Sequence, residues 1–230
     1  MVDRLFSEPA LAEWYDTFCG WDQRDDLEFY PPMVMMADRV LHVGCGTGLL
    51  LRRAREHGHT GRLCGLDPAA AMLDVARQHP DIEWVLGDLG STTWRDEFDL
   101  VVMTGHAFQV LLTDAKVRGA LNAMHGALAD RGAAAFETRN PAAREWERWT
   151  PDDPIEVVDG QGRIMRMEQR VESVQEDIVR FTLTYITPLW GREEVSESAL
   201  RFLDAPTLDG FLEDAGFMIE QRFGDWNRGH

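Results

Sequence analysis

The segment 44–48 reads Gly-Cys-Gly-Thr-Gly and directly follows the apolar residues 40–43. Its glycines allow a tight backbone turn and let a ligand approach with no Cβ in the way. Asp67 ends a second apolar run, and Asp88 ends a third. A carboxylate at the first position can accept both hydroxyls of a ribose, and one at the second can accept the exocyclic amine of adenine. The turn and the two acids therefore predict a binding site for an adenosyl group.

These residues stand at the ends of short apolar runs that are typical of buried β-strands. Between the runs, apolar residues recur at helical spacing, as in the stretch with Val117, Leu121 and Met124. Strands that alternate with helices predict a parallel sheet with right-handed crossovers, whose strand ends line one crevice. Pro68 is expected to be the first helical residue after a cap at Asp67. We expect strands at residues 39–43, 62–67, 82–86, 98–103 and 132–136.

The spacing changes after residue 149 from helical to alternating. Val179, Phe181, Leu183 and Tyr185 are expected to face one way, with polar residues between them. A helix is expected after Asp204, followed by a last strand at residues 217–223. The predicted fold class is α/β: a Rossmann-like, doubly wound, mostly parallel sheet with helices on both faces and an antiparallel β insertion before the last helix.

The chain of 230 residues fits one domain. We expect an N-terminal helical lid at 1–37, closed by Pro31 and Pro32, and a cofactor-binding core at 38–141. The β insertion at 150–203 is expected on the substrate side, and the last helix and strand at 204–226.

Composition narrows the classes of partner. The net charge of −17 disfavours nucleic acid, and the densest basic cluster, Arg52, Arg53 and Arg55, has the pattern of a solvated helix face. The three cysteines are too few and too scattered to predict a disulfide framework or a metal site. We find neither a signal peptide nor an apolar run long enough to span a membrane, and expect a cytoplasmic protein without a membrane partner.

The kind of nucleotide follows from what surrounds the turn. A dinucleotide site needs glycine or alanine where Leu49 stands, and it has no usual task for Asp88. The turn also lacks a basic residue to meet a phosphate. S-adenosylmethionine has no phosphate, and its cationic sulfonium suits an acidic protein. An NAD(P)-dependent oxidoreductase and a non-catalytic S-adenosylmethionine-binding protein remain as alternatives.

These segments resemble the motifs of class I S-adenosylmethionine-dependent methyltransferases of the small-molecule type. Residues 40–48 resemble the first motif, although His42 stands where the family often has leucine. Residues 65–68, with Met72, resemble the second motif, residues 87–89 the third, and residues 98–101 the fourth strand. Residues 212–217 are similar to the last helix and turn of the family. The likeness is close over about residues 39–140 and looser over 204–223.

The resemblance implies S-adenosyl-L-methionine as cofactor and S-adenosyl-L-homocysteine as product. It implies a floor of glycines under the methionyl group, a ribose held by Asp67 and an adenine edge read by Asp88. The N-terminal Tyr15 would close over the cofactor, or serve only as a packing aromatic. The cofactor-binding residues expected are Tyr15, Gly44, Cys45, Gly46, Gly48, Asp67, Pro68, Met72, Asp88, Leu89, Thr104 and His106.

Two features depart from simple expectation. Cys45 is common in the turn of this family, and we interpret it as a small packing residue and not a nucleophile. Members of the family usually end in a β-hairpin, whereas only one strand is expected here after the last helix. Either the insertion supplies the missing strand or the chain is shortened.

Methyl transfer is an in-line displacement that needs alignment, and it needs a base only if the acceptor holds a proton. His106 is the candidate base, although it could equally line the pocket through its backbone. Arg139 could orient an acceptor carboxylate or pair with Glu137. Aromatic residues of the insertion side could roof the acceptor or simply form the insertion's core. The acceptor candidates are Arg139, Asn140, Tyr185 and Trp190, with Trp146 and Trp149 beside them.

We expect a small-molecule acceptor that is methylated on O, N or C. A protein or nucleic-acid acceptor would require a larger recognition element or a basic face. The chain also lacks the Asn-Pro-Pro-aromatic signature of nucleic-acid amino-methylating enzymes after the fourth strand. The protein is expected to be a monomer or a homodimer.

Overall fold

The structure is a computed structural model that describes residues 2–21 and 24–229. Its centre is a five-stranded sheet with the order β3-β2-β1-β4-β5, in which every neighbouring pair is parallel. The strand ends that carry the candidate site therefore lie along one edge of the sheet, as the alternating pattern predicts. The strands are β1 (Arg39–Val43), β2 (Arg62–Asp67), β3 (Glu83–Leu86), β4 (Phe98–Met103) and β5 (Leu128–Phe136).

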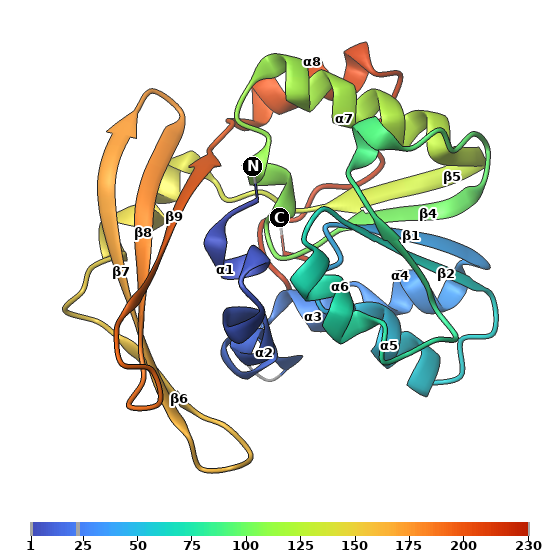
Figure 1. Ribbon diagram of the computed structural model, residues 1–230. Helices are drawn as coiled ribbons and strands as arrows, with labels where there is room; N and C mark the ends of the chain where they lie inside the picture. Colours follow the sequence, from blue (N-terminus) through green and yellow to red (C-terminus); the bar gives the residue numbers. More distant parts are fainter. Residues whose placement is uncertain (1, 22–23, 230) are drawn as a thin grey trace.

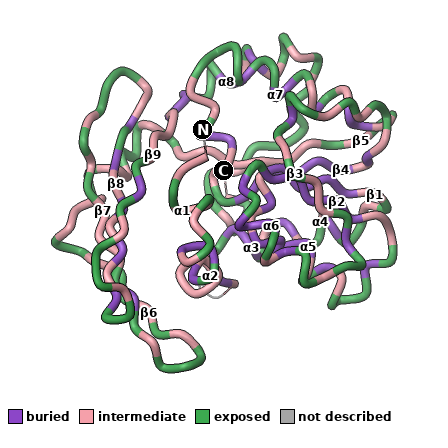
Figure 2. Tube along the Cα trace, in the orientation of Figure 1, coloured by how far each residue is buried: buried purple, intermediate pink, exposed green. Residues whose placement is uncertain are grey.

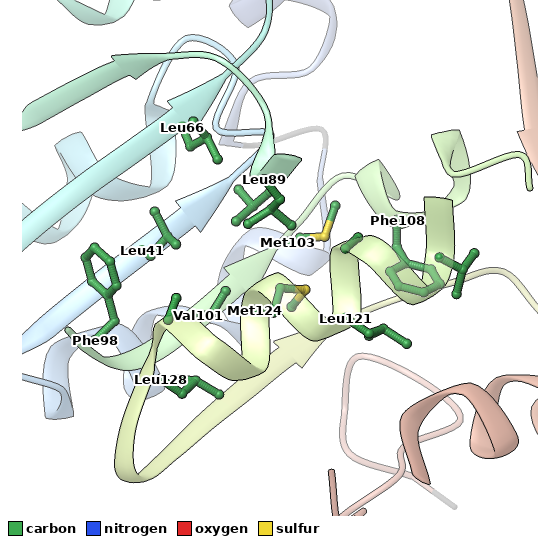
Figure 3. Close-up of a cluster of buried hydrophobic side chains, with 14 of the residues drawn as sticks. Leu41, Leu66, Leu89, Phe98, Val101, Met103, Phe108, Leu121, Met124 and Leu128 are labelled. Carbon is green, nitrogen blue, oxygen red and sulfur yellow. The ribbon is translucent and has the colours of Figure 1, made fainter. Parts of the chain in front are cut away.

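Helices cover both faces of this sheet (Figure 1). One face packs on α7 and α8, where Leu41 and Val101 of the strands meet Leu121 and Met124 of α7 (Figure 3). The other face packs on α4 and α5, whose helical spacing supplies the matching apolar stripe. These helices are α4 (Pro31–Met36), α5 (Leu49–Glu56), α6 (Ala70–Ala76), α7 (Asp114–Ala127) and α8 (Ala205–Asp214).

The expected insertion forms a separate four-stranded antiparallel sheet, with the order β6-β7-β8-β9. The predicted inward face is confirmed, because Val179, Phe181, Leu183 and Tyr185 are all buried. Figure 1 shows this sheet standing apart from the core, with α1 and α2 between the two. The elements are α1 (Arg4–Ser7), α2 (Pro9–Phe18), α3 (Asp26–Phe29), β6 (Ile155–Val158), β7 (Ile164–Gln175), β8 (Ile178–Ile186) and β9 (Glu194–Arg201).

Helix α2 packs between the antiparallel sheet and helix α6 through opposite sides. Leu11 and Trp14 pack on the antiparallel sheet, whereas Ala12 packs on Met72 of α6. Figure 2 shows buried residues along the parallel strands and more exposed ones over the antiparallel sheet. The N-terminal helices therefore form part of the core, which fixes them against the edge that carries the site.

Two predicted helix boundaries are wrong. Pro31 and Pro32 begin α4 and do not close a helix, since proline at the first helical positions needs no amide donor. Pro68 precedes α6, which starts at Ala70. The Asp67 side chain accepts a hydrogen bond from the Ala69 amide at 2.8 Å and holds the intervening residues in a turn.

The expected strand at 217–223 is also wrong, because these residues form no strand. The apolar contacts of the segment lie at its ends: Phe217 packs on His125 and Phe223 on Phe29. Between them Met218 is 89% exposed and makes no ladder with β5. The strands of the insertion pair only with one another within the described residues, so the insertion supplies no strand to the parallel sheet there.

Among residues 2–21 and 24–229, no helix has both the length and the apolar character needed to cross a membrane.

Candidate functional site

The glycine-rich turn after β1 has a backbone conformation and surroundings that leave little room for side chains. Gly44, Gly46 and Gly48 have φ angles of +67°, +56° and +80°, which favour glycine. A Cβ on Gly44 would lie 2.9 Å from the Cβ of Ala107. Above Gly46 the first atom met is Cε1 of Tyr15, 4.0 Å from the Cβ position. The turn therefore leaves an open floor beneath the Tyr15 ring.

Asp67 connects the turn to the end of β2. Its Oδ2 accepts a hydrogen bond from the Gly46 amide at 2.8 Å, and its Oδ1 accepts one from the Ala69 amide. Burial raises the pKa of this carboxyl, and the two amides oppose that shift. Each oxygen keeps a second lone pair, so the carboxylate can still accept ligand hydroxyls.

Asp88 follows β3 and is exposed. Its Oδ1 accepts a hydrogen bond from the Ser91 amide at 3.1 Å and caps the short helix η2 (Leu89–Ser91), while Leu89 is buried beneath it. The second carboxylate oxygen has no partner among the described residues. The structure thus brings Asp88 to the same edge of the sheet as Asp67, with an acceptor atom free.

The first helices close this edge from above. Asp16 of α2 accepts hydrogen bonds from Thr47 at 2.5 Å and from Arg52 at 2.6 Å, which ties α2 to the turn. Tyr15 therefore lies over Gly46, whereas Met72 is fully buried against α2. Burial raises the pKa of the Tyr15 phenol, and the nearby Cys19 thiol adds to this shift.

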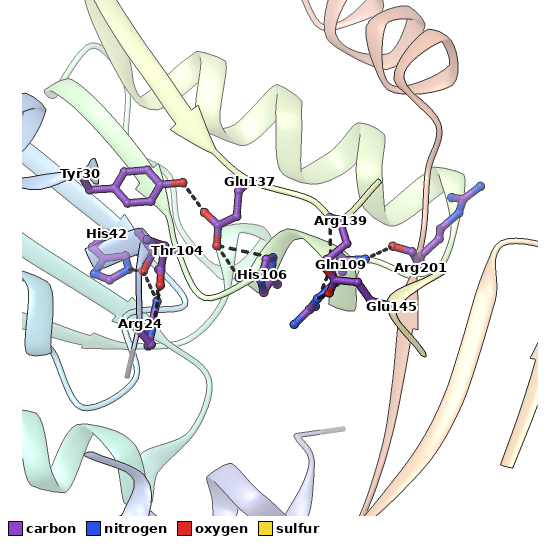
Figure 4. A network of polar contacts seen from close by, with 11 residues as sticks. Arg24, Tyr30, His42, Thr104, His106, Gln109, Glu137, Arg139, Glu145 and Arg201 are labelled. Carbon is purple, nitrogen blue, oxygen red and sulfur yellow. Dashed lines mark hydrogen bonds and ion pairs between the residues drawn. The ribbon is translucent and has the colours of Figure 1, made fainter. Parts of the chain in front are cut away.

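Arg24 and His42 are two polar residues at this edge that motif reasoning did not identify (Figure 4). The Arg24 guanidinium pairs with Asp26 through two hydrogen bonds and reaches Thr104 Oγ1 at 3.4 Å. It lies over Gly105, where a Cβ would be 3.3 Å from Nη1. No sequence motif identifies Arg24, because its contacts with Thr104 and Gly105 join it to a loop about 80 residues away along the chain.

His42 lies inside β1 and is 2% exposed. Its Nε2 lies 3.1 Å from Thr104 Oγ1, and its Nδ1 is buried without a hydrogen-bond partner. Burial, with the nearby Arg24 charge, lowers the pKa of His42 to about 3, so the ring is neutral. A histidine inside the otherwise apolar run 40–43 was a visible signal of this polar cluster.

His106 follows β4 in a left-handed conformation, with φ of +60°. Its backbone amide donates to Glu137 Oε1 at 2.6 Å, and the Tyr30 hydroxyl donates to Glu137 Oε2. Burial raises the pKa of Glu137 to about 7, and burial together with Arg139 lowers that of His106 to about 3. Glu137 at the end of β5 is thus a central residue of the cluster (Figure 4).

Comparison with known proteins agrees with this geometry. The family described as a methyltransferase domain matches residues 40–132. A 2-phytyl-1,4-naphtoquinone methyltransferase of Nostoc is 30% identical over 63% of this chain and 70% of its own length. The chain belongs to the S-adenosylmethionine-dependent methyltransferase family.

Other relatives match shorter stretches or the fold. A 2-phytyl-1,4-naphtoquinone methyltransferase of Thermosynechococcus vestitus is 52% identical over 21% of this chain and 24% of its own. The solved structure of Streptomyces venezuelae DesVI has a TM-score of 0.74 at 19% identity, covering 94% of each chain. CalS10, an amino pentose methyltransferase from Micromonospora echinaspora, has a TM-score of 0.65 at 25% identity, over 84% of this chain and 82% of its own.

The cofactor of this methyltransferase family is S-adenosylmethionine, and the residues present fit it. The space between Gly46 and the Tyr15 ring is open only because residue 46 has no side chain. Asp67 and Asp88 provide acceptors for hydroxyl and amine groups, while the turn holds no lysine or arginine for a phosphate. This donor set suits an adenosyl thioether better than a pyrophosphate, and the oxidoreductase alternative is set aside.

The methyltransferase's candidate acceptor residues lie beyond the end of β5. Arg139 forms an ion pair with Glu145 at 2.8 Å, and not with Glu137, and it donates to Gln109 Oε1 at 2.9 Å. Asn140 accepts a hydrogen bond from the Ala142 amide at 2.9 Å and caps a short helix. These contacts make both side chains part of the framework between β5 and the antiparallel sheet.

Tyr185 and Trp190 belong to the cluster between the antiparallel sheet and α2. Tyr185 is 2% exposed, and its ring packs edge-on against Phe18 at 5.8 Å. A cavity of about 810 Å³ lies between residues 144–151 and β7. Trp149 lines this cavity, and the Arg139 guanidinium lies 5.5 Å from its ring, so the cavity lies next to the residues that follow β5.

Cys45 is buried against Leu73, Ala76 and Trp84. Burial, with the nearby Asp67 charge, raises the pKa of the thiol well above its usual value. A neutral, enclosed thiol is a poor nucleophile, which supports the interpretation of Cys45 as a packing residue.

Proposed function

We propose that this methyltransferase transfers the methyl group of S-adenosylmethionine to an O, N or C atom of a small molecule by in-line displacement. The observation that carries the proposal is the Asp67 carboxylate, which accepts a hydrogen bond from the Gly46 amide at 2.8 Å and so joins the glycine-rich turn to the end of β2, where we propose that the ribose binds. An enzyme that mainly aligns two reactants needs such a rigid junction.

Each part of the cofactor has a candidate residue. Asp67 would accept the ribose hydroxyls, and Asp88 with the Leu89 amide would bind the adenine edge, next to Pro68 and Met72. Gly44, Gly46 and Gly48 would form the floor under the methionyl group, with Tyr15 above. Arg24, over Gly105, would pair with the methionyl carboxylate as well as with Asp26, since a guanidinium has several donors and is the usual partner of a carboxylate.

A small-molecule acceptor is supported by chemistry and by relatives. The net charge of −17 opposes a polyanion. The Nostoc relative is named as a methyltransferase of a naphthoquinone, and CalS10 is named as a methyltransferase of an amino pentose. Arg139 and Asn140, which follow β5, are the proposed acceptor side, together with Trp190 of the insertion; Tyr185, buried under α2, would act only by supporting them.

The sulfonium supplies an activated methyl group. The protein's own task is to position the acceptor lone pair opposite the sulfur, to exclude water and to remove a proton where the acceptor carries one. His106, beside the expected position of the methyl group, is the proposed base. Its ring is neutral at physiological pH because its pKa is lowered to about 3.

The test is a titration of purified protein with S-adenosylmethionine, S-adenosylhomocysteine and NAD, read by thermal unfolding. At 100 times the dissociation constant, either thioether should add about 2.7 kcal/mol of stability, and NAD should add none. Asp67→Ala should abolish the gain. Asp74→Ala, which removes an acid whose side chain is 72% exposed, should leave it intact. A folded protein that responds to NAD and to neither thioether would overturn the proposal.

A further inference from the structure

The two nitrogens of the His106 ring have different surroundings. Nδ1 is buried, has no hydrogen-bond partner, and lies 3.9 Å from Glu137 Oε1. Nε2 makes no hydrogen bond to the described residues and, unlike Nδ1, is not a buried atom. The His106 side chain is 27% exposed. The ring therefore turns Nδ1 toward a carboxylate and leaves Nε2 for a ligand.

Glu137 is held in place on both oxygens. Oε1 accepts the His106 amide at 2.6 Å, and Oε2 accepts the Tyr30 hydroxyl. Tyr30 is 1% exposed and packs edge-on against Phe29 at 5.4 Å. These two hydrogen bonds restrain the carboxylate beside the ring, 3.9 Å from Nδ1, and this separation must shorten by about 1 Å for a hydrogen bond to form.

We infer that Glu137 is a positioning residue and proton acceptor for His106: it fixes the tautomer with hydrogen on Nδ1, so that Nε2 can take the proton of the methyl acceptor. The inference rests on the proposed function, in which His106 is the base. It assigns Glu137 and Tyr30 a part in the reaction, and it requires an acceptor with a removable proton, such as an amine or a hydroxyl.

The proton balance of this step avoids a buried cation. The bond between hydrogen and the acceptor atom breaks as an Nε2–H bond forms, and the Nδ1–H bond breaks as an O–H bond forms on Glu137. His106 is neutral before and after the step, and the carboxylate becomes a carboxylic acid. The lone pair freed on the acceptor then attacks the methyl carbon, and the electrons of the carbon–sulfur bond remain on sulfur.

The charges around the pair favour the proton on Glu137. Arg139 after β5 and Arg24 before α3 face the ring and oppose an imidazolium, while Asp26 of α3 acts in the opposite direction. Burial raises the pKa of Glu137 to about 7 against the opposing hydrogen bonds from Tyr30 and the His106 amide. Near neutral pH the pair can therefore exchange a proton with little cost.

The experiment is nitrogen-15 NMR of the histidine rings, on the full chain with and without S-adenosylhomocysteine, from pH 5.5 to 8.5. His106→Gln identifies the signals. The expected result is hydrogen on Nδ1 at pH 8 and a shift toward hydrogen on Nε2 as the pH falls through about 7 and Glu137 becomes protonated. The ring should stay neutral throughout, because the pKa of His106 is near 3.

Two variants separate this role from a structural one. Glu137→Gln should remove the pH dependence of the tautomer between pH 6 and 8. Tyr30→Phe keeps the carboxylate but removes the donor that stabilises its charged form, so the transition should move to higher pH. Hydrogen on Nε2 at pH 8 in the native protein, or an unchanged transition in Glu137→Gln, would overturn the inference.

The same samples distinguish the two proposals. Absence of binding to S-adenosylhomocysteine contradicts the proposed function, whatever the tautomer of His106. Binding together with the wrong tautomer contradicts only the role of Glu137. Because the native protein is titrated first, the result does not depend on whether either variant folds.

Discussion

The Trp84 indole lies directly against the α-carbon of Gly48. A Cβ on Gly48 would lie 2.8 Å from Cζ3 of that ring and closer still to Cη2. The indole nitrogen donates to the His79 carbonyl at 2.9 Å, which fixes the ring in place. The last glycine of the turn is thus required both by its φ angle and by the side chain beneath it.

Gly48→Ala should therefore unfold the protein more readily and weaken binding of S-adenosylhomocysteine. The left-handed conformation costs about 1–2 kcal/mol for a residue with a Cβ, and crowding against Trp84 adds about 1–3 kcal/mol. Gly58→Ala is the matched control, since Gly58 has φ of +90° with nothing within 4 Å of its Cβ position. Denaturant unfolding of the two variants measures the loss of stability, and its repetition with S-adenosylhomocysteine measures binding. An equal loss of stability in Gly48→Ala and Gly58→Ala would contradict the role of Trp84.

Arg24→Gln should weaken binding of S-adenosylhomocysteine about 10- to 100-fold, the usual worth of a charge-assisted hydrogen bond. Methylthioadenosine, which lacks the amino acid part, should bind both proteins equally. Calorimetric titration with the two ligands measures the difference. Arg53→Gln, at a guanidinium 46% exposed, is the control. An equal loss for methylthioadenosine would show that Arg24 does not contact the carboxylate.

His42→Leu should stabilise the protein in acid. The pKa of His42 is lowered to about 3 in the folded state, so the native protein loses stability as the pH falls below about 6.5. At pH 5 this loss amounts to about 2 kcal/mol, and leucine does not incur it. Urea unfolding at pH 5 and pH 7.5 measures the change, with the exposed His57→Leu as control. A gain of equal size at both pH values would rule out this cause.

Glu137→Gln should change the pH dependence of stability in the opposite sense. The pKa of Glu137 in the folded protein is raised to about 7. The protonated carboxyl therefore contributes stability that is fully present below about pH 4.5 and is lost as the pH rises through 7. Relative to the variant, the free energy of unfolding of the native protein should fall by about 3 kcal/mol between pH 4.5 and pH 8. Unfolding curves at these values measure the loss, and Glu147→Gln, 61% exposed, serves as control. Parallel curves for Glu137→Gln and the native protein would contradict the raised pKa.

Part of the site followed from local rules. The turn 44–48, Asp67 and Asp88 were predicted because a strand end, a glycine turn and an acid are features of neighbouring residues. The same holds for the strand faces of the insertion, where Phe181 and Leu183 alternate with polar residues. The error at 217–223 has the same origin, since an alternating pattern predicts a strand without showing whether a partner edge is in reach.

The sequence by itself determined the parallel sheet, the succession of strands and helices along the chain and the candidate edge for an adenosyl group, because short-range periodicity and turn chemistry specify them. Only the tertiary structure decided the polar cluster, which joins Arg24 to Thr104 across 80 residues and Tyr30 to Glu137 across 107. It also decided that Arg139 pairs with Glu145. Such pairings depend on how the first helices pack over the strand ends, and a buried polar group takes whichever partner that packing brings within hydrogen-bond distance.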